Sequence, residues 1–448
     1  MKLFGTDGIR DLAGGEKMNP EIAMKFGKAM VAHCRKKKIS PDIIIARDTR
    51  ESGPEFEEAV ISGILSAGGN AILTGVIPTP GLSYLVREQK AGAGIVISAS
   101  HNQFEYNGLK PFGSGGEKLN DKEELELERY ILEGNFSGET NKDFAPRKKI
   151  ILSGAKEKYI NFLLEKFFSH FETSNLKLVL DCANGATYEV APAVFGRVSE
   201  APILLYTSPD GRNINDKCGS QYPEKLKEEV LKRGADMGLA FDGDGDRVIA
   251  IDEKGRELTG DHIIYIIAKM LKAKGELKNN LVVTTVMSNL GFVESLKKLG
   301  IRHITTAVGD RQVFFEMKKR GAILGGEESG HIIFSDFHPA GDGIVGGLML
   351  IAAIKYFGKS LSKLAGEITL LPKLLVNVKV KSKPELDTIP EIQNIIKEVE
   401  DKLGNGDRVL VRYSGTENLC RIMVEGKDRK EIAKYAQRII DVIRKQLS

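Results

Sequence analysis

The chain has 448 residues, and its 65 Lys and Arg against 61 Asp and Glu leave a net charge of only +4. Hydrophobic residues make up 42% of it, which is enough for sizeable cores and excludes a disordered or collagen-like chain. The near-neutral balance argues against a histone-like or tail-driven nucleic-acid binder, which needs a concentrated basic surface. At roughly 150 residues per domain, the length suggests about three domains and is also compatible with two or four.

Short apolar or β-branched runs alternate with amphipathic helical patterns along most of the chain. Such runs, bounded by Gly or Pro turns, are typical of parallel strands buried on both faces, and their alternation with helices predicts an α/β fold. We expect strands at 42–46, 71–74, 95–98, 177–180, 202–206, 237–241, 281–285 and 323–324, and helices at 20–34, 54–66, 156–168, 223–233, 261–272 and 290–299.

Changes in composition suggest where the domains meet. Residues 134–152 are polar and are expected to form a linker, a second boundary follows the turn at 252–255, and the pattern changes to alternating strand character at 368–384. We therefore predict three similar mixed-sheet α/β domains at 1–150, 151–255 and 256–370, and a smaller C-terminal α+β domain at 371–448.

The cysteines and the apolar segments suggest a cytoplasmic protein. Cys34, Cys182, Cys218 and Cys420 are widely spaced and form no CxxC, which favours reduced thiols over a disulfide framework. The first residues, MKLFGTDGIR, lack the apolar run of a signal peptide. The most apolar stretch, 343–354, is too short to span a bilayer and is expected to be a buried helix.

A first polar cluster, SASHN at 98–102, directly follows the apolar run GIVI. A hydroxyl at the carboxyl end of a parallel strand lies where α/β folds bind ligands, so Ser100 and His101 are candidate functional residues. Lys110 follows in NGLK. A hydrolase elbow would need glycine two residues before and after Ser100, which the sequence lacks. An exposed turn is the alternative.

A second cluster, DGDGDR, follows the strand-like run MGLAF. Asp242, Asp244 and Asp246 repel one another unless a cation joins them, and hard oxygen ligands favour Mg²⁺. An EF-hand loop would need glycine where Arg247 stands, and VIAID follows as a strand rather than as the rest of a loop. We therefore expect a magnesium site with open coordination positions.

Three further clusters could bind sugar or phosphate. GGEESGH offers hydrogen bonds to sugar hydroxyls and a possible acid or base, RYSGTE with a following arginine suits a phosphate dianion, and FGTDGIR contributes one more arginine. RYSGTE has no GK[ST] ending, so no nucleoside triphosphate is implied. Each cluster alone could be a solvated turn. The candidate residues are Gly326, Glu327, Ser329, His331, Arg412, Ser414, Gly415, Thr416, Arg421 and Arg10.

In this order, FGTDGIR, SASHN…NGLK, DGDGDR, GGEESGH and RYSGTE resemble the motifs of the α-D-phosphohexomutase superfamily, and the resemblance spans almost the whole chain. The opening FGTDGIR, VGDR at 308–311 and GGEESGHIIF most resemble the bacterial phosphoglucosamine mutase branch, with phosphomannomutase/phosphoglucomutase as the neighbouring alternative. The chain departs from the superfamily pattern at Asp11, Gln103 and Asn418.

The resemblance implies a fold arranged around a central cleft and a mutase that interconverts glucosamine 6-phosphate and glucosamine 1-phosphate for amino-sugar nucleotide and cell-wall precursor synthesis. Ser100 would carry the phosphoryl group, and one Mg²⁺ would be held by Ser100 and the three aspartates. A 1,6-bisphosphate would be the intermediate and the primer.

The resemblance also implies a role for each candidate residue. Lys110 and His331 would be acid or base, while Arg10, Arg247 and His101 would serve the phosphoryl group. Gly326, Glu327 and Ser329 would bind the sugar, and Arg412–Thr416 with Arg421 the non-reacting phosphate. The partner would be a hexosamine phosphate, with no nucleic acid or membrane, and a homodimer is allowed for. A metal-dependent phosphohydrolase and a non-catalytic sugar-phosphate binder are the rival hypotheses.

Overall fold

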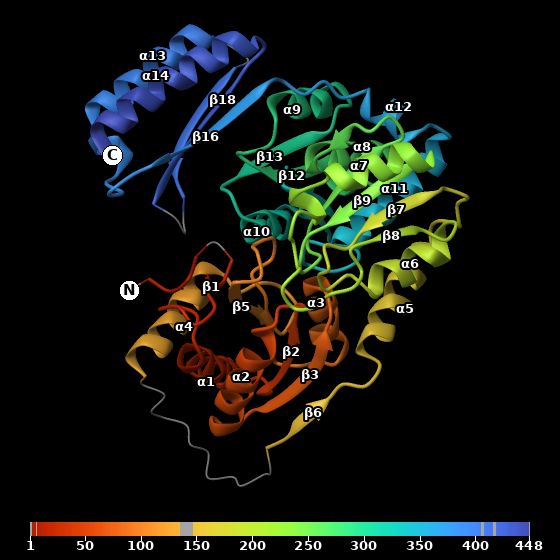
Figure 1. The fold of residues 1–448 in the computed structure, drawn as a ribbon, viewed down its shortest axis with the longest axis vertical. Coiled ribbons are helices and arrows are strands. Elements are labelled where there is room, and N and C mark those ends of the chain that lie inside the picture. The colour runs from red at the N-terminus through yellow and green to blue at the C-terminus, as the bar shows by residue number, and fades with distance from the viewer. Residues whose placement is uncertain (1, 6, 135–146, 405–406, 415–417, 448) are drawn as a thin grey trace. The chain divides into compact units, whose positions relative to one another are not determined.

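The computed structural model describes residues 2–5, 7–134, 147–404, 407–414 and 418–447. The chain divides into two compact units, one made of 1–287 and 301–367, the other of 288–300 and 368–448. Among the described residues the first unit contains three mixed sheets and the second an antiparallel sheet (Figure 1). The α/β fold class predicted from the sequence is confirmed.

The first sheet has six strands, which in sheet order are β1 (Ile9–Leu12), β5 (Tyr106–Gly113), β4 (Ala93–Ile97), β2 (Asp42–Arg47), β3 (Asn70–Val76) and β6 (Lys149–Ile151). Its helices are α1 (Pro20–Lys36), α2 (Gly53–Ser66), α3 (Thr79–Glu88) and α4 (Asp121–Glu133). Ile43 of β2 shares a core cluster with Phe26 and Phe56, so α1 and α2 cover that face. A Cβ on Gly94 would lie 2.6 Å from Leu82, so α3 packs closely on the opposite face.

Strand β6 falls inside the stretch 134–152 that its polar composition marked as a linker. It pairs in parallel with Ala71, Ile72 and Leu73 of β3. All three residues of β6 are exposed, so the pattern of a buried strand is missing from the sequence. Residues 135–146 of the expected linker lie outside the described residues.

The second and third sheets follow in the same unit. The second runs β11 (Glu257–Leu258), β10 (Val248–Asp252), β9 (Met237–Phe241), β7 (Leu178–Asp181) and β8 (Ile203–Leu205), and the third β13 (Arg302–Thr306), β12 (Leu281–Thr285), β14 (Leu324–Gly326) and β15 (Ile332–Phe334). Both mix parallel and antiparallel pairs. The helices are α5 (Ala155–Phe168), α6 (Val190–Val198), α7 (Glu224–Arg233), α8 (Gly260–Ala273), α10 (Asp310–Arg320), α11 (Gly343–Phe357) and α12 (Leu361–Ala365).

Helix α11 contains the apolar stretch 343–354, and all of these residues are buried, as the sequence predicts. The helix contacts β10 of the second sheet and β15 of the third. A Cβ on Gly346 would meet Val248 at 2.8 Å and Ile332 at 3.3 Å, one from each sheet. A helix that is apolar all round is therefore explained by burial between two sheets. No helix in the described ranges combines the length and apolar character needed to cross a membrane.

The four cysteines are buried free thiols. Burial raises the pKa of Cys34 to about 12 and that of Cys420 to about 11. Because the thiolate is the reactive form, thiols with pKa values this high are inert at neutral pH.

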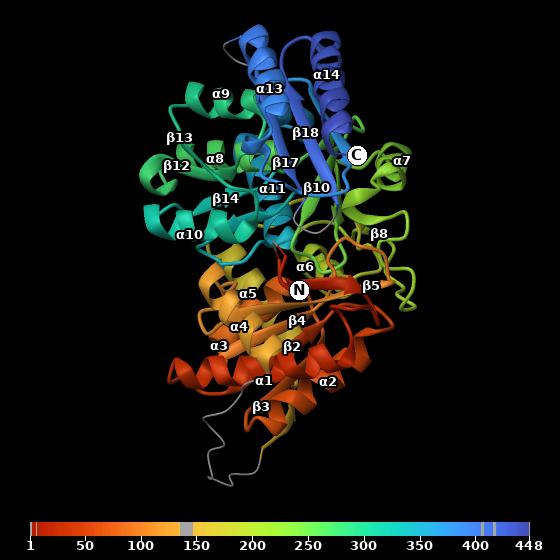
Figure 2. The ribbon, with the colours of Figure 1, turned by 90° about the vertical axis from the view of Figure 1, so that its left-hand side faces the viewer.

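The second unit contains an antiparallel sheet of β16 (Lys373–Lys379), β18 (Leu419–Glu425) and β17 (Arg408–Tyr413). Helices α13 (Pro390–Leu403) and α14 (Arg429–Leu447) lie side by side along the sheet, as Figure 2 shows, and share its core. Helix α9 (Leu290–Lys298) belongs to this unit as well, since Glu425 accepts a 2.9 Å hydrogen bond from the Leu290 amide. Two helices and a three-stranded sheet agree with the α+β character expected for the C-terminal segment.

Candidate active site

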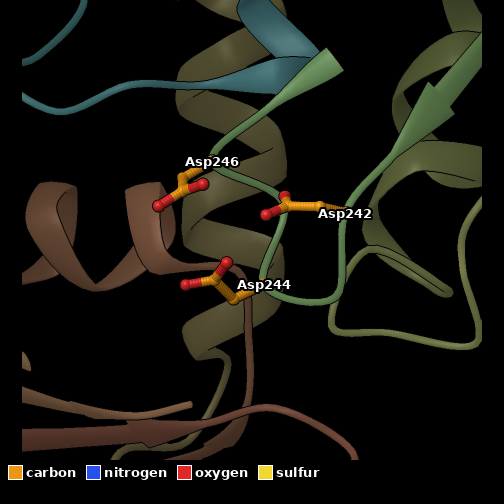
Figure 3. Close-up of side chains that lie close together, drawn as sticks. All are labelled: Asp242, Asp244 and Asp246. Atoms are coloured by element: carbon orange, nitrogen blue, oxygen red, sulfur yellow. The ribbon is translucent and has the colours of Figure 1, made fainter. Parts of the chain in front are cut away.

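Three buried aspartates occupy the turn between β9 and β10. The strands pair through Phe241 and Val248, so DGDGDR forms the loop of a hairpin. One carboxylate oxygen from each of Asp242, Asp244 and Asp246 lies within 4.8 Å of the other two, and Figure 3 shows the three groups close together along the loop. The hairpin agrees with the strand predicted after the motif and excludes the helix that an EF-hand needs.

The chemistry of these oxygens fits a hard divalent cation. Oδ1 of Asp244 and Oδ1 of Asp246 are buried and accept no hydrogen bond from any described residue. Burial, and then the neighbouring charges of Asp246 and Asp244, raise the pKa of Asp242 to about 7. Buried oxygens without donors are costly, and a cation would satisfy them.

Ser100 lies in the turn after β4 and meets this loop directly. Its side chain is fully buried, and its Oγ donates a 2.6 Å hydrogen bond to Oδ2 of Asp242. The backbone of Ser100 has φ +54°, a left-handed conformation that is uncommon for serine. The structure therefore brings SASHN and DGDGDR together, as their places at strand ends suggest.

Lys110, on β5, is buried among carboxylates. Its Nζ lies 2.6 Å from Asp244, 3.0 Å from Asp7 and 3.3 Å from Asp246. Burial opposes the charge of Lys110, but Asp244, Asp246 and Asp7 outweigh it and hold the pKa well above its ordinary value. Thr79 donates a hydrogen bond to the same carboxylate oxygen of Asp244 as Lys110 does.

Lys110 belongs to a closed ring of alternating charges. Asp7, which contacts Lys110, also lies 2.7 Å from Lys118 Nζ. Lys118 Nζ lies 2.7 Å from Asp310. His331 Nε2 lies 3.1 Å from Asp310 and 3.5 Å from Asp246, which leads back to Lys110. Burial opposes protonation of His331, but the two aspartates raise its pKa to about 9. Each charge in the ring therefore has an opposite charge on both sides.

Four residues of this site were not expected from the sequence, namely Asp7, Lys118, Asp310 and Thr79. Asp7 and Asp310 stand inside recognised motifs, FGTDGIR and VGDR, and could have been found there. Lys118 and Thr79 carry no motif signal, because their roles come only from folding.

Arg10, His101 and Arg247 surround the Ser100 turn and the aspartate loop. Arg10 Nη1 donates a 3.0 Å hydrogen bond to the side chain of Asn102, and the Arg247 amide donates to Oδ1 of Asp242 at 3.2 Å. Burial, followed by the charges of Arg247, Arg10 and Lys110, lowers the pKa of His101 to about 2, so its imidazole is neutral. The three residues add positive charge and a neutral ring beside Ser100.

The GGEESGH segment crosses from β14 to β15 next to Arg247. The backbones of Arg247 and His331 form an isolated bridge, and Gly330 is required there because a Cβ would meet the Val248 carbonyl at 2.3 Å. Glu327 is buried and its Oε1 accepts a 3.0 Å hydrogen bond from the Gly309 amide. Of the other candidate sugar contacts, Gly326 is buried and Ser329 is exposed.

The candidate phosphate residues lie in the second unit. Arg412 on β17 stands directly opposite Arg421 on β18. Ser414, at the end of β17, is buried, and its carbonyl accepts a 2.8 Å hydrogen bond from Lys383. Gly415 and Thr416 lie outside the described residues. Two arginines directly opposite each other across a strand pair suit the binding of an anion such as phosphate.

Asp11, a departure from the superfamily pattern, has a local role. Its Oδ1 accepts from the Leu12 amide at 2.9 Å and its Oδ2 from the Lys17 amide at 3.0 Å. The side chain therefore supports the turn after β1 and leaves the neighbouring Arg10 beside Asn102.

Four family models match the chain in order. They describe alpha/beta/alpha domains I, II and III of phosphoglucomutase/phosphomannomutase, at residues 1–137, 157–255 and 259–370, and the C-terminal domain at 375–442.

Relatives and solved structures agree with these matches. A phosphoglucosamine mutase of Syntrophus aciditrophicus is 51% identical over 100% of this chain and 99% of its own, and one of Brevibacillus brevis is 45% identical over 100% and 99%. A phosphoglucomutase/phosphomannomutase family protein of Burkholderia thailandensis has the same fold, with a TM-score of 0.82 and 21% identity over 99% and 97% of the chains.

A further structure, Aspergillus fumigatus N-acetylphosphoglucosamine mutase in complex with GlcNAc-6P and magnesium, has a TM-score of 0.72 at 18% identity over 99% and 96% of the chains. The motifs, the four matched domains and the full-length relatives lead to one conclusion. The chain belongs to the phosphoglucomutase/phosphomannomutase family and, within it, to the phosphoglucosamine mutases, which are isomerases.

Proposed function

We propose that this chain interconverts glucosamine 6-phosphate and glucosamine 1-phosphate, with Ser100 carrying the transferred phosphoryl group. The main support is the 2.6 Å hydrogen bond from Ser100 Oγ to Asp242 inside a group of three buried carboxylates. A protein that only binds sugar phosphates has no need of a hydroxyl held against such a group. The amino-sugar substrate is supported by the names of relatives that are 45–51% identical over nearly the full chain.

The reaction balances as two phosphoryl transfers. The bond from phosphorus to Ser100 Oγ breaks, a bond to the free hydroxyl of the sugar monophosphate forms, and that hydroxyl gives up its proton. The resulting 1,6-bisphosphate turns end for end. Its other phosphoryl group then bonds to Ser100 Oγ, and the sugar oxygen it leaves takes up a proton.

Lys110 and His331 are the residues that we propose for proton transfer and charge stabilisation. Both are buried next to the aspartates, and the carboxylates of Asp244, Asp246 and Asp310 favour their charged forms. Arg10 and Arg247 would add positive charge where the phosphoryl group moves. Glu327 and Ser329 would hold sugar hydroxyls, and Arg412, Ser414 and Arg421 the non-reacting phosphate.

Asp242, Asp244 and Asp246 would hold one Mg²⁺, with an oxygen of phosphorylated Ser100 as a further ligand. The ion would neutralise charge on the transferring group. Oδ1 of Asp244 and Oδ1 of Asp246, which are buried and accept no hydrogen bond from the described residues, support this choice. A sugar 1,6-bisphosphate would prime the enzyme by phosphorylating Ser100.

The test is a coupled assay that compares glucosamine 6-phosphate, glucose 1-phosphate and mannose 1-phosphate in the presence of Mg²⁺ and bisphosphate primer. We expect the highest kcat/KM for the amino sugar; a preference for glucose or mannose phosphate would favour the phosphoglucomutase/phosphomannomutase alternative. Ser100→Ala should abolish turnover and phosphoprotein formation, while Ser66→Ala, which removes a hydroxyl that donates to the Gly63 carbonyl at 2.9 Å, should do neither.

A cytoplasmic location and a homodimer go with this proposal as further predictions. Light scattering during size-exclusion chromatography distinguishes a monomer from a dimer. A single species at the mass of one chain would reject the dimer.

A further inference from the structure

The turn that carries Ser100 is fixed by a buried arginine from a neighbouring strand end. Arg50 follows β2 and its side chain is fully buried. A guanidinium has five N–H donors in a rigid fork. Every one of the five has an acceptor here, which is the largest number of hydrogen bonds that an arginine can donate.

One donor goes to a carboxylate and four go to the backbone around Ser100. Nε donates to Oδ2 of Asp48 at 2.8 Å. Nη2 donates to the carbonyls of Ser100 at 3.1 Å and Asn102 at 2.7 Å, and Nη1 to those of Gln103 and, at 2.9 Å, Tyr106. The guanidinium of Arg50 therefore hydrogen-bonds four backbone carbonyls of residues 100–106.

Asp48 holds the same turn by a second route. Its Oδ2 accepts a 2.6 Å hydrogen bond from Ser98 Oγ, and that hydroxyl in turn accepts the Ser100 amide at 2.9 Å. Both the amide and the carbonyl of Ser100 are thus tied, directly or through one side chain, to the Asp48–Arg50 pair. Such ties account for a serine that keeps the left-handed φ of +54°, a conformation that is unfavourable for residues other than glycine.

Asn215 closes the arrangement from the segment matched by family domain II. Its Nδ2 donates to the carbonyls of Ser100 at 2.9 Å and Asn102 at 2.8 Å, which Arg50 also contacts. Gly243 of the aspartate loop approaches the same point, since a Cβ there would lie 2.5 Å from the Ser100 carbonyl and 2.7 Å from Asn215 Nδ2. The Ser100 turn, Asn215 and the aspartate loop are therefore in close contact, which fixes their positions relative to one another.

We propose that Arg50 and Asn215 are positioning residues for phosphoryl transfer, which act by holding the carbonyls of Ser100 and Asn102 so that Ser100 Oγ faces Asp242. The inference rests on the proposed role of Ser100. Neither side chain donates to Ser100 Oγ, so neither is a catalytic residue. Ser100 must serve both ends of a sugar bisphosphate from one place, and a displacement of about 1 Å can cost about 100-fold in rate.

Arg50→Lys tests the fork, because lysine keeps the charge opposite Asp48 but has only three donors. Asn215→Gly removes the second clamp and tolerates the backbone φ of +57° at that position. For both variants we expect kcat to fall by about 30- to 100-fold while KM for glucosamine 6-phosphate stays within about threefold, because the sugar contacts are elsewhere. The rate at which glucose 1,6-bisphosphate phosphorylates Ser100, followed by intact-protein mass, should fall in parallel with kcat.

Arg212→Lys is the matched control. Arg212 pairs with Glu51, the neighbour of Arg50, at 2.6 Å, and joins the same two segments of the chain, but its side chain is 69% exposed and does not touch the Ser100 turn. This variant should keep the wild-type kcat. A thermal unfolding midpoint for each variant separates a displaced Ser100 from a loss of folded protein.

The outcomes are distinct. If Ser100→Ala is inactive but folded Arg50→Lys and Asn215→Gly both retain kcat within about threefold of wild type, the positioning proposal is wrong and the role of Ser100 stands. If Ser100→Ala keeps normal turnover, the proposed function itself is wrong. Should Arg50→Lys fail to fold, Asn215→Gly alone decides, since it leaves no buried charge unpaired.

Discussion

Lys118 Nζ lies 2.7 Å from a carboxylate oxygen of Asp310, and the pair joins the segments matched by family domains I and III. Both side chains are under 10% exposed. Asp7 contacts Lys118 on one side and His331 contacts Asp310 on the other. If one of these charges is removed, its partner stays buried and water cannot compensate for the lost interaction. The ring therefore links the packing of the two segments to the electrostatics of the active site.

Lys118→Met should therefore destabilise the protein strongly. The substitution leaves Asp7 and Asp310 each short of a buried partner, and breaking a buried pair costs about 3 to 5 kcal/mol. We expect that loss in the free energy of unfolding, measured by urea denaturation. Lys278→Met is the control, because its pair with Asp336 at 3.2 Å is 62% and 45% exposed and contributes at most about 1 kcal/mol. Similar losses for both variants would contradict the prediction.

Asp242→Asn should separate stability from metal binding. Burial and the charges of Asp246 and Asp244 raise the pKa of Asp242 to about 7. Its negative charge therefore destabilises the folded protein when no metal is bound. We expect the variant to unfold at a higher temperature than wild type in EDTA, and to gain nothing when Mg²⁺ is added, whereas wild type gains stability with Mg²⁺. The exposed Asp216→Asn should behave like wild type. A variant that Mg²⁺ still stabilises would reject the metal site.

His262 should make stability depend on pH. It closes a capping box at the start of α8, where its Nδ1 accepts the Thr259 amide at 3.3 Å. Burial, followed by the charge of Arg256, lowers its pKa to about 4 from the ordinary value near 6.5. The unfolded chain therefore binds the proton first, and the stabilisation present above pH 6.5 is lost as pH falls towards 4.

His262→Gln keeps a side chain suited to the capping box but does not titrate. We expect equal stability at pH 7, and at pH 5 an advantage for the variant of about 2 kcal/mol, from 1.36 kcal/mol per pH unit. Urea denaturation at both pH values measures it. Parallel curves for the two proteins would show that His262 does not titrate in this window.

Arg421→Gln should weaken substrate binding rather than the chemical step. Arg421 stands opposite Arg412 in the second unit, so its loss removes a cation from the proposed phosphate contact. We expect KM for glucosamine 6-phosphate to rise by about 10-fold or more. Arg438→Gln, which breaks a pair with Glu398 in the same unit, should leave KM unchanged.

The sequence predicted the site best where one short segment contains the chemistry. Asp242, Asp244 and Asp246 share a single loop, and Ser100 follows a buried apolar run, so residue types and strand ends were enough to select them. Strands β2, β4, β7, β9 and β12 and helices α1, α2, α5, α7, α8 and α9 were expected for the same reason, since their apolar patterns are local. Strand β5, which lies between β1 and β4 in its sheet, was not expected. Exposed β6 and the polar edge strand β1 lack that periodicity and were missed.

Residues whose role depends on partners far away in the chain were not among the candidate site residues chosen from the sequence. Arg50, Asn215 and Lys118 act on the backbone or on charges that only the folded chain brings near. Nothing in their immediate neighbours distinguishes them from surface residues. The domain boundaries and the roles of the individual site residues stay predictions that the experiments above test.

Helix α11 has a consequence for how this chain can be divided. Because Gly346 sits against Val248 on one side and Ile332 on the other, the helix supplies interior surface to the second and third sheets at once. A fragment that stops after β11 would leave the apolar face of β10 bare to water. Fragment design should therefore keep residues 157–370 in one piece. A hybrid enzyme that exchanges only 157–255 or only 259–370 needs an α11 that packs against both sheets to stay soluble.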